Sequence, residues 1–189
     1  LDFITRRAGE PFFAYLAFNA PHTPLQIADQ WADPYREAGV NEAHARIYGM
    51  VSNIDHNVGR VQAKLAELNL ADNTLVVFTS DHGPCGSAQN QEAPAGERHR
   101  WNGGLRGIKG SVYQGGVQVP SLWHWPGHVP AGRDVDCLAA TVDVLPTLAD
   151  LCGAQLPEQP VDGVSLAAQL TERPGTSPER TVFMQWHRG

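Results

Sequence analysis

Hydrophobic positions follow two different periods in the first eighty residues of the chain. Across residues 47–68 apolar side chains recur every three or four positions, which predicts one amphipathic helix that starts near Asn41 and stops at Asn69. Residues 12–18 and 75–78 are instead short apolar runs, typical of strands buried on both faces of a parallel sheet. Strand, helix and strand in this order predict a right-handed crossover unit.

The second half of the chain is less regular. Residues 83–118 are rich in Gly, Gln and Arg and show little periodicity, which is typical of a long loop that is either functional or disordered. A short helix is expected over residues 142–151, with Thr141 as its cap and Gly153 just past its end. Residues 117–125 form another apolar run, and a last strand is expected over residues 181–186.

Composition narrows the class of protein. The formal net charge of -6 and the absence of any Lys/Arg run argue against a nucleic-acid-binding surface. No apolar stretch approaches the ~18 residues that a membrane span requires. The three cysteines show no CxxC spacing, so there is no zinc signature, and one disulfide or none remains open. Because the chain starts without Met or a signal peptide, we expect a piece of a longer protein.

The run at 75–78 leads directly to an acid and an imidazole, Asp81 and His82. Ligand sites in open α/β sheets lie just beyond the carboxyl ends of such strands, which places both side chains where a metal is held. Gly83 follows and allows a tight backbone turn. The alternative is an ordinary polar turn after a strand, with Asp as a turn former.

Four segments, in order, resemble the sulfatase family of the alkaline phosphatase superfamily. They are PFFAYLAFNAPHTP at 11–24, TSDHG at 79–83, LRGIKGSVYQGGVQVP at 105–120 and TVDVLPTLADLCG at 141–153. DGVSL at 162–166 adds a further match, and the pattern is most like the arylsulfatase and N-acetylhexosamine-6-sulfatase branch. The resemblance implies an α/β fold: part of an alkaline-phosphatase-like sandwich, with a mostly parallel sheet flanked by helices and the N-terminal part missing.

That resemblance implies a hydrolase of sulfate esters that uses a formylglycine nucleophile and a divalent cation, usually Ca²⁺. Asp81 and His82 match two of the family's metal ligands, although many members have Asn in place of His82. A carboxylate and an imidazole, completed by other carboxylates, suit Ca²⁺ or Mg²⁺, and the nitrogen donor also admits Mn²⁺.

Two further residues match family positions near the sulfate. Lys109, framed by Gly107 and Gly110, resembles the lysine that contacts the sulfate oxygens, where a flexible point charge neutralises charge on the leaving group. His22 lies between two prolines and resembles the histidine near the leaving oxygen, to which an imidazole donates a proton. The alternatives are a solvated loop lysine and a turn histidine bonded to nearby carbonyls.

The chain also departs from the family pattern. Gln114 and Gln118 stand where the family usually has Glu and Arg, so neutral hydrogen bonds are expected in place of an ion pair. No Cys or Ser starts a C/S-x-P/A-x-R signature, and the Asp pair of the first strand is absent. We therefore expect residues 1–170 to be part of the catalytic domain and residues 171–189 to be the start of a truncated C-terminal segment. The isolated 189-residue chain is expected to be inactive and prone to self-association.

Two rival functions remain open. A phosphatase, phosphodiesterase or phosphonate hydrolase of the same superfamily would share the strand-end Asp and His, but the block at 105–120 favours a sulfatase. A non-catalytic metal- or anion-binding module would bind Ca²⁺ tightly without a nucleophile. The partner expected from the resemblance is a small-molecule or saccharide sulfate ester. In this family loops recognise the alcohol part of the ester, but the loop at 84–104 contains no motif that identifies which alcohol. Export is expected by resemblance alone.

Overall fold

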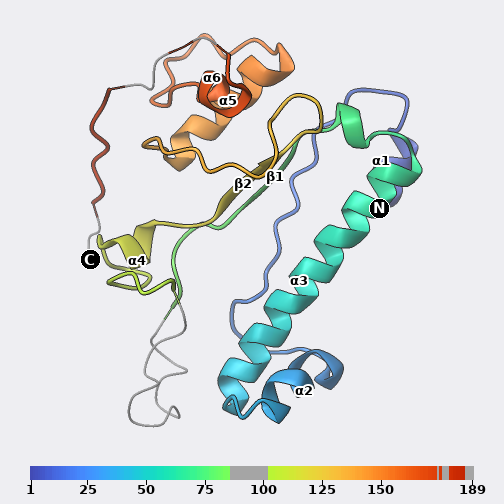
Figure 1. Ribbon diagram of the computed structural model, residues 1–189, viewed down its shortest axis with the longest axis vertical. Helices are drawn as coiled ribbons and strands as arrows, with labels where there is room; N and C mark the ends of the chain where they lie inside the picture. Colours follow the sequence, from blue (N-terminus) through green and yellow to red (C-terminus); the bar gives the residue numbers. More distant parts are fainter. Residues whose placement is uncertain (86–101, 174, 176–178, 186–189) are drawn as a thin grey trace. The chain divides into compact units, whose positions relative to one another are not determined.

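The computed structural model describes residues 1–85, 102–173, 175 and 179–185. The chain forms two compact units, one made of Leu1–Ala71 with Ser80–Val119 and the other of Asp72–Thr79 with Pro120–Gly189. Figure 1 labels their elements along the chain. In chain order the elements are α1 (Asp2–Arg6), α2 (Asp29–Glu37), α3 (Glu42–Glu67), η1 (Ala71–Asn73), β1 (Val76–Thr79), α4 (Gln114–Val117), β2 (Ser121–His124), η2 (Thr141–Asp143), α5 (Val144–Cys152) and α6 (Ala167–Thr171).

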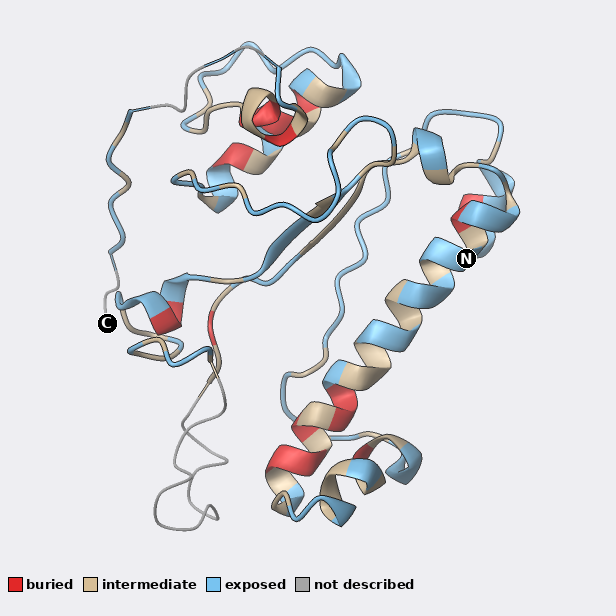
Figure 2. Ribbon diagram, in the orientation of Figure 1, coloured by how far each residue is buried: buried red, intermediate tan, exposed pale blue. Residues whose placement is uncertain are grey.

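Helix α3 confirms the element predicted from the apolar period. The side chain of Asn41 accepts a hydrogen bond from the amide of His44 at 3.0 Å and so caps the first turn. Asn69, the predicted stop, adopts a left-handed φ of 56° just beyond the helix. Leu65 is buried near one end of α3, but in Figure 2 most of the buried residues of this helix gather at the other end, beside α2. There Gly49 lets the backbone of Trp31 approach closely, because an added Cβ would lie 2.9 Å from its carbonyl group.

The strand predicted at residues 12–18 is wrong: these residues belong to no strand in the structure. Most of the segment is exposed, including Phe13 at 74% and Tyr15 at 82% of their full surface. A strand exists only through hydrogen bonds to a neighbour, and the described part of the chain offers none to this segment. The expected crossover from this strand to β1 is therefore not formed.

The sheet of the second unit has two strands, β1 and β2, and they are antiparallel. Val76 pairs with His124 and Thr79 with Ser121, so the apolar runs at 75–78 and 117–125 supply one strand each. A mostly parallel sheet is thus not observed among the described residues. No strand forms over 181–185 either, and Trp186 lies outside the described residues.

Helix α5 confirms the predicted short helix, with a later start. Thr141 belongs to η2, and Asp143 precedes the first residue of α5. Gly153 follows the last turn with a φ of 67°, as its place in the sequence predicts. The Thr147 hydroxyl, fully buried on α5, accepts the amide hydrogen of Leu166 at 3.0 Å and ties α5 to the segment that leads into α6.

Asp143 is the most buried acid described in the structure. It is 1% exposed and accepts the amide hydrogens of Ala140 at 2.7 Å and Val164 at 3.0 Å. Arg180 completes the set, with one guanidinium nitrogen 2.7 Å from a carboxylate oxygen and the other bonded to the second oxygen. Three separate segments of the second unit therefore meet at one carboxylate.

Candidate functional site

The acid and imidazole predicted as metal ligands lie two and three residues beyond β1, in the first compact unit. Asp81 is exposed, and its Oδ2 lies 3.2 Å from Nε2 of His82. The Nδ1 atom of His82 is 2.8 Å from the carbonyl oxygen of Gly83. A carbonyl oxygen only accepts, so Nδ1 carries a proton and Nε2 is the ring atom turned toward Asp81.

This donor pair fits a divalent cation in two respects. Ligating histidines commonly donate their second ring N–H to a backbone carbonyl, which is the bond that His82 makes to Gly83. Adjacent ligands on metal bonds of about 2.0–2.4 Å lie roughly 3 Å apart, close to the spacing of these two atoms. In the described residues no three His, Cys, Asp or Glu side chains are grouped to hold a metal, so this pair by itself would supply only part of a coordination shell.

Gly83 is required here by a close backbone contact. Its amide donates to the carbonyl oxygen of Gly116 at 2.9 Å, and an added Cβ would collide with the carbonyl oxygen of Gly115. The sequence predicts a tight turn at Gly83, but the φ of Gly83 is not in the left-handed region. Glycine is therefore needed here because a side chain would not fit, and not because of the backbone conformation. The segment after β1 is thereby fixed against the loop that contains α4.

Lys109 lies on that same loop, at the corner of a four-residue turn. The Ser111 amide donates to the Ile108 carbonyl oxygen at 3.0 Å, and Gly110 has the positive φ of 83° that the third residue of a type II turn requires. The amide of Lys109 donates to the carbonyl oxygen of Pro84 at 2.9 Å. The structure therefore brings the backbone of Lys109 to the segment that follows Asp81 and His82, with the lysine side chain exposed.

His22 lies in the same unit, between two cis peptide bonds at Pro21 and Pro24. Its amide donates to the carbonyl oxygen of Asn19 at 3.0 Å, and its Nδ1 lies 2.8 Å from the carbonyl oxygen of Thr23. The histidine is exposed, and its hydrogen bonds in the described structure are made within residues 19–23. The structure thus joins Lys109 to the Asp81–His82 segment but gives His22 no bond to either.

Several residues that shape this site were not found from the sequence. The side-chain amide of Asn102 donates to the carbonyl oxygens of Leu105 at 2.7 Å and Gly107 at 3.0 Å. The guanidinium of Arg106 lies 3.8 Å from the centre of the Tyr113 ring. A glycine-rich, aperiodic loop carries no signal for such contacts. Most of the loop at 84–104 that was expected to read the substrate lies outside the described residues.

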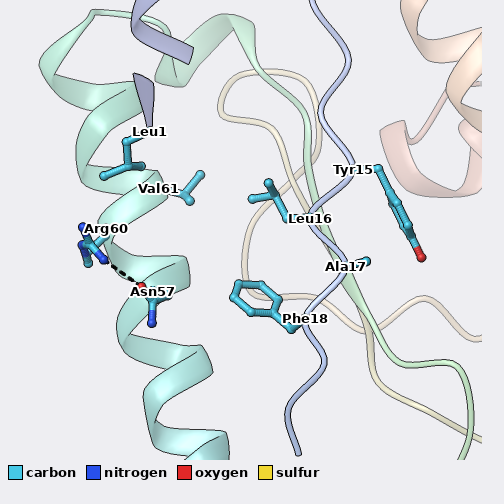
Figure 3. Close-up of a pocket in the computed structure, with 8 residues that line it drawn as sticks. All are labelled: Leu1, Tyr15, Leu16, Ala17, Phe18, Asn57, Arg60 and Val61. Atoms are coloured by element: carbon cyan, nitrogen blue, oxygen red, sulfur yellow. Dashed lines mark hydrogen bonds between the residues drawn. The ribbon is translucent and has the colours of Figure 1, made fainter. Parts of the chain in front are cut away.

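A hollow elsewhere in the first unit lacks the predicted site residues. It lies between residues 15–18 and α3, and Figure 3 shows Leu16 and Phe18 turned toward the helix while Tyr15 points away. On the helix, Arg60 donates to the side-chain oxygen of Asn57 at 2.9 Å. Its largely apolar lining suits packing better than catalysis. In the described part of the chain, no helix combines the length and apolar character needed to cross a bilayer.

The chain is similar to known proteins over most of its length. The family model described as Sulfatase matches residues 1–154. Steryl-sulfatase of Rattus norvegicus is 38% identical over 171 residues, which are 89% of this chain and 28% of that protein. Arylsulfatase A of Homo sapiens is 34% identical over 94% of this chain and 32% of its own length. The chain therefore spans about a third of the curated relatives that it matches.

Solved structures are similar to this chain as well. The crystal structure of Ps i-CgsB in complex with k-i-k-neocarrahexaose has a TM-score of 0.79 and 37% identity, covering 90% of this chain and 36% of that one. The phosphonate monoester hydrolase SpPMH from Silicibacter pomeroyi has a TM-score of 0.55 and 28% identity, covering 85% and 27%. These neighbours support the predicted α/β class and a partial fold of this superfamily.

Proposed function

Because this chain belongs to the sulfatase family, we propose that the full-length protein hydrolyses sulfate esters. The supporting observation within the chain is the backbone connection between the turn of Lys109 and residues 83–84, which directly follow Asp81 and His82. Two amide hydrogen bonds, from Lys109 to Pro84 and from Gly83 to Gly116, join the backbone of a cationic residue to the segment that follows the exposed carboxylate of Asp81 and the half-buried imidazole of His82. An anionic ester and a divalent cation need such neighbouring groups.

The roles follow from the chemistry of each side chain. Asp81 and His82 would hold the cation, for which we propose Ca²⁺, together with ligands from outside this pair. The cation would supply Lewis-acid stabilisation of negative charge on the ester. Lys109 would hold the sulfate oxygens as a point charge, and His22 would protonate the departing alcohol oxygen.

Membership in the sulfatase family implies, in general, a metal ion and a formylglycine residue. The 189 residues contain no C/S-x-P/A-x-R sequence from which formylglycine would be made. We therefore expect the 189-residue chain alone to show no hydrolysis of p-nitrophenyl sulfate above background. Hydrolysis by the pure chain that disappears on chelation would contradict this expectation.

The function is tested on the full-length protein carrying formylglycine. Asp81→Asn should lower both the bound metal per protein and kcat/KM, and Lys109→Ala should lower kcat/KM by about 100-fold. Lys64→Ala is the matched control, because it removes a lysine whose partner is Glu67 on the surface of α3. Wild-type kcat/KM in Lys109→Ala would remove Lys109 from the site, and a metal content unaffected by Asp81→Asn would remove Asp81.

A phosphonate or phosphodiester hydrolase is the second candidate. The likeness to a phosphonate monoester hydrolase favours it, since sulfate and phosphate groups are similar in shape and charge. The two candidates separate by the ratio of kcat/KM for a sulfate monoester and a phosphonate or phosphodiester. A preference for the phosphorus ester by orders of magnitude would replace the proposal.

A non-catalytic module is the third candidate and makes a different prediction for calcium. Asp81 and His82 are far short of the six to eight oxygens that Ca²⁺ prefers, so we expect weak binding to the 189-residue chain. Calorimetry that shows micromolar affinity would favour the module.

Self-association is proposed for the isolated 189-residue chain. The segment around Phe13, Tyr15 and Leu16 leaves 74%, 82% and 54% of these side chains exposed. Large apolar side chains exposed along one segment are an aggregation liability. Light scattering should show oligomers, and a monodisperse monomer with a cooperative melt would contradict the proposal.

Three broader proposals rest on the family alone. Residues 1–170 are assigned to the catalytic domain and 171–189 to the start of the C-terminal segment. The sulfated alcohol is a small molecule or a saccharide, and the protein is exported. Fractionation of the natural host tests the last of these, since activity confined to the cytosol would exclude export.

A further inference from the structure

The turn that carries Lys109 is held by three hydrogen bonds between its first and last residues. The Ser111 amide donates to the Ile108 carbonyl oxygen at 3.0 Å, as in any closed turn. The Ser111 hydroxyl donates to the same oxygen at 2.8 Å and accepts the Ile108 amide hydrogen at 3.2 Å. One side chain therefore bonds to both backbone groups of Ile108, with Lys109 between them at the corner.

Two glycines leave the space that this hydroxyl occupies. A Cβ added to Gly107 would lie 2.5 Å from the Ser111 Oγ, and one added to Gly116 would lie 2.7 Å from it. Gly107 also has a φ of 95°, which side chains rarely adopt. The Ser111 hydroxyl therefore occupies its position only because Gly107 and Gly116 have no side chains, since a side chain at either position would displace it.

The same packing connects the turn to the metal-ligand candidates. Gly116 contacts Ser111 on one side and accepts the Gly83 amide hydrogen at 2.9 Å on the other. Lys109 adds the bond from its amide to Pro84 at 2.9 Å. The position of the Lys109 Cα relative to the segment of Asp81, His82 and Gly83 therefore depends on whether the turn keeps its shape.

We propose that Ser111 is a positioning residue, whose hydroxyl fixes the turn so that Lys109 presents its ammonium group to the sulfate. This inference rests on the proposed role of Lys109. Ser111 acts through the backbone, because its hydroxyl bonds lie within the turn. A lysine side chain has four rotatable bonds, so fixing its Cα is the contribution that the fold makes to its aim.

A double-mutant cycle in the full-length, formylglycine-carrying protein tests the proposal. Ser111→Ala should lower kcat/KM for p-nitrophenyl sulfate about tenfold while Lys109 is present, since small misplacements of a catalytic group are costly. In a Lys109→Ala background the same change should alter kcat/KM by less than about twofold, because the group being positioned is gone. The inhibition constant of inorganic sulfate should follow the same non-additive pattern.

Ser165→Ala is the matched control, because its hydroxyl donates to Asp150 at 2.6 Å in the second unit. It should leave kcat/KM unchanged in both backgrounds. If Ser111→Ala does not fold, Ser111→Cys keeps a side chain of similar shape with weaker hydrogen bonds, and the cycle is repeated with it.

The outcomes separate the two proposals. An equal loss from Ser111→Ala with and without Lys109 would show a purely structural role and overturn the positioning proposal alone. Wild-type kcat/KM in Lys109→Ala would instead overturn the role of Lys109, and the inference from Ser111 with it.

Discussion

Distant chain segments meet at Gly83 and at Asp143 by opposite means. Around Gly83 the contacts are made by backbone atoms, and they close because Gly83 has no side chain that would collide with the carbonyl group of Gly115. Around Asp143 the contacts are made by charge: a carboxylate that is 1% exposed bonds to Arg180 and to two backbone amides.

The difference explains which acids remain available to a ligand. Near Gly83 the segments are joined by hydrogen bonds between backbone groups, so no side chain is needed to hold them together. Asp81 and Lys109 therefore stay exposed and can bind an external ion. Asp143 has both carboxylate oxygens occupied by internal donors, so it stabilises the fold and does not act on a substrate. An acid is therefore a ligand candidate when its surroundings are held together without it.

The strongest test of this comparison is Gly83→Ala. The new Cβ would collide with the backbone of Gly115, which has no flexible end that can move aside. We expect the segment after β1 to separate from the turn of Lys109, with kcat/KM of the full-length protein falling more than about 100-fold. Kinetics and a thermal melt measure the effect, and wild-type activity would show that the contact is not needed.

Arg180→Ala tests the charged region. Removing the guanidinium leaves a buried carboxylate without its cation, which we expect to destabilise the second unit by about 3 kcal/mol. Hydrogen exchange of the α5 amides measures this locally. Arg173→Ala is the control, because its ion pair with Asp150 is largely exposed and should contribute less than about 1 kcal/mol. Equal effects of the two changes would refute the distinction.

The pH dependence of the second unit sharpens the same point. Burial by itself raises the pKa of Asp143, but hydrogen bonds from Arg180 and from the Val164 and Ala140 amides lower that pKa below its ordinary value. An acid with a lowered folded-state pKa stabilises the fold above its unfolded pKa of about 4, and this contribution is lost as the pH falls through the folded value.

Below about pH 4 the α5 amides should therefore lose protection more steeply in the wild type than in Asp143→Asn. The change from pH 7 downward is the quantity to compare, since Asp143→Asn also lowers stability at neutral pH. Asp134→Asn, at an exposed position, should follow the wild type. Identical slopes for the wild type and Asp143→Asn would exclude Asp143 as a source of the acid sensitivity.

The smallest effect is expected at a glycine with no neighbours. Gly59 lies within α3, and an added Cβ would meet nothing within 4 Å. Gly59→Ala should stabilise the protein by roughly 0.5–1 kcal/mol, because alanine loses less backbone entropy in a helix. A small rise in melting temperature beside the large loss from Gly83→Ala would show that contact, and not glycine itself, sets the cost.

Local signals were sufficient for α3 and α5, whereas α1, α2, α4 and α6 were not predicted from the sequence. Asn41, Asn69 and Gly153 were predicted as boundary residues from the sequence, and each lies at a helix end in the structure. Capping and a left-handed residue past the last turn depend on neighbours within about four positions. Thr141 was wrong as the cap of α5, because it belongs to η2 and Asp143 is the residue that precedes α5.

The sequence by itself determined that Asp81, His82 and Lys109 were candidates, because the first two follow an apolar run and all three match positions of the family pattern. Only the tertiary structure decided that the turn of Lys109 bonds to the segment after β1, that Ser111 holds this turn, and that residues 12–18 form no strand. The physical reason is range. A helix makes its hydrogen bonds within one segment, whereas a strand or a loop contact needs a partner whose position the local sequence does not specify.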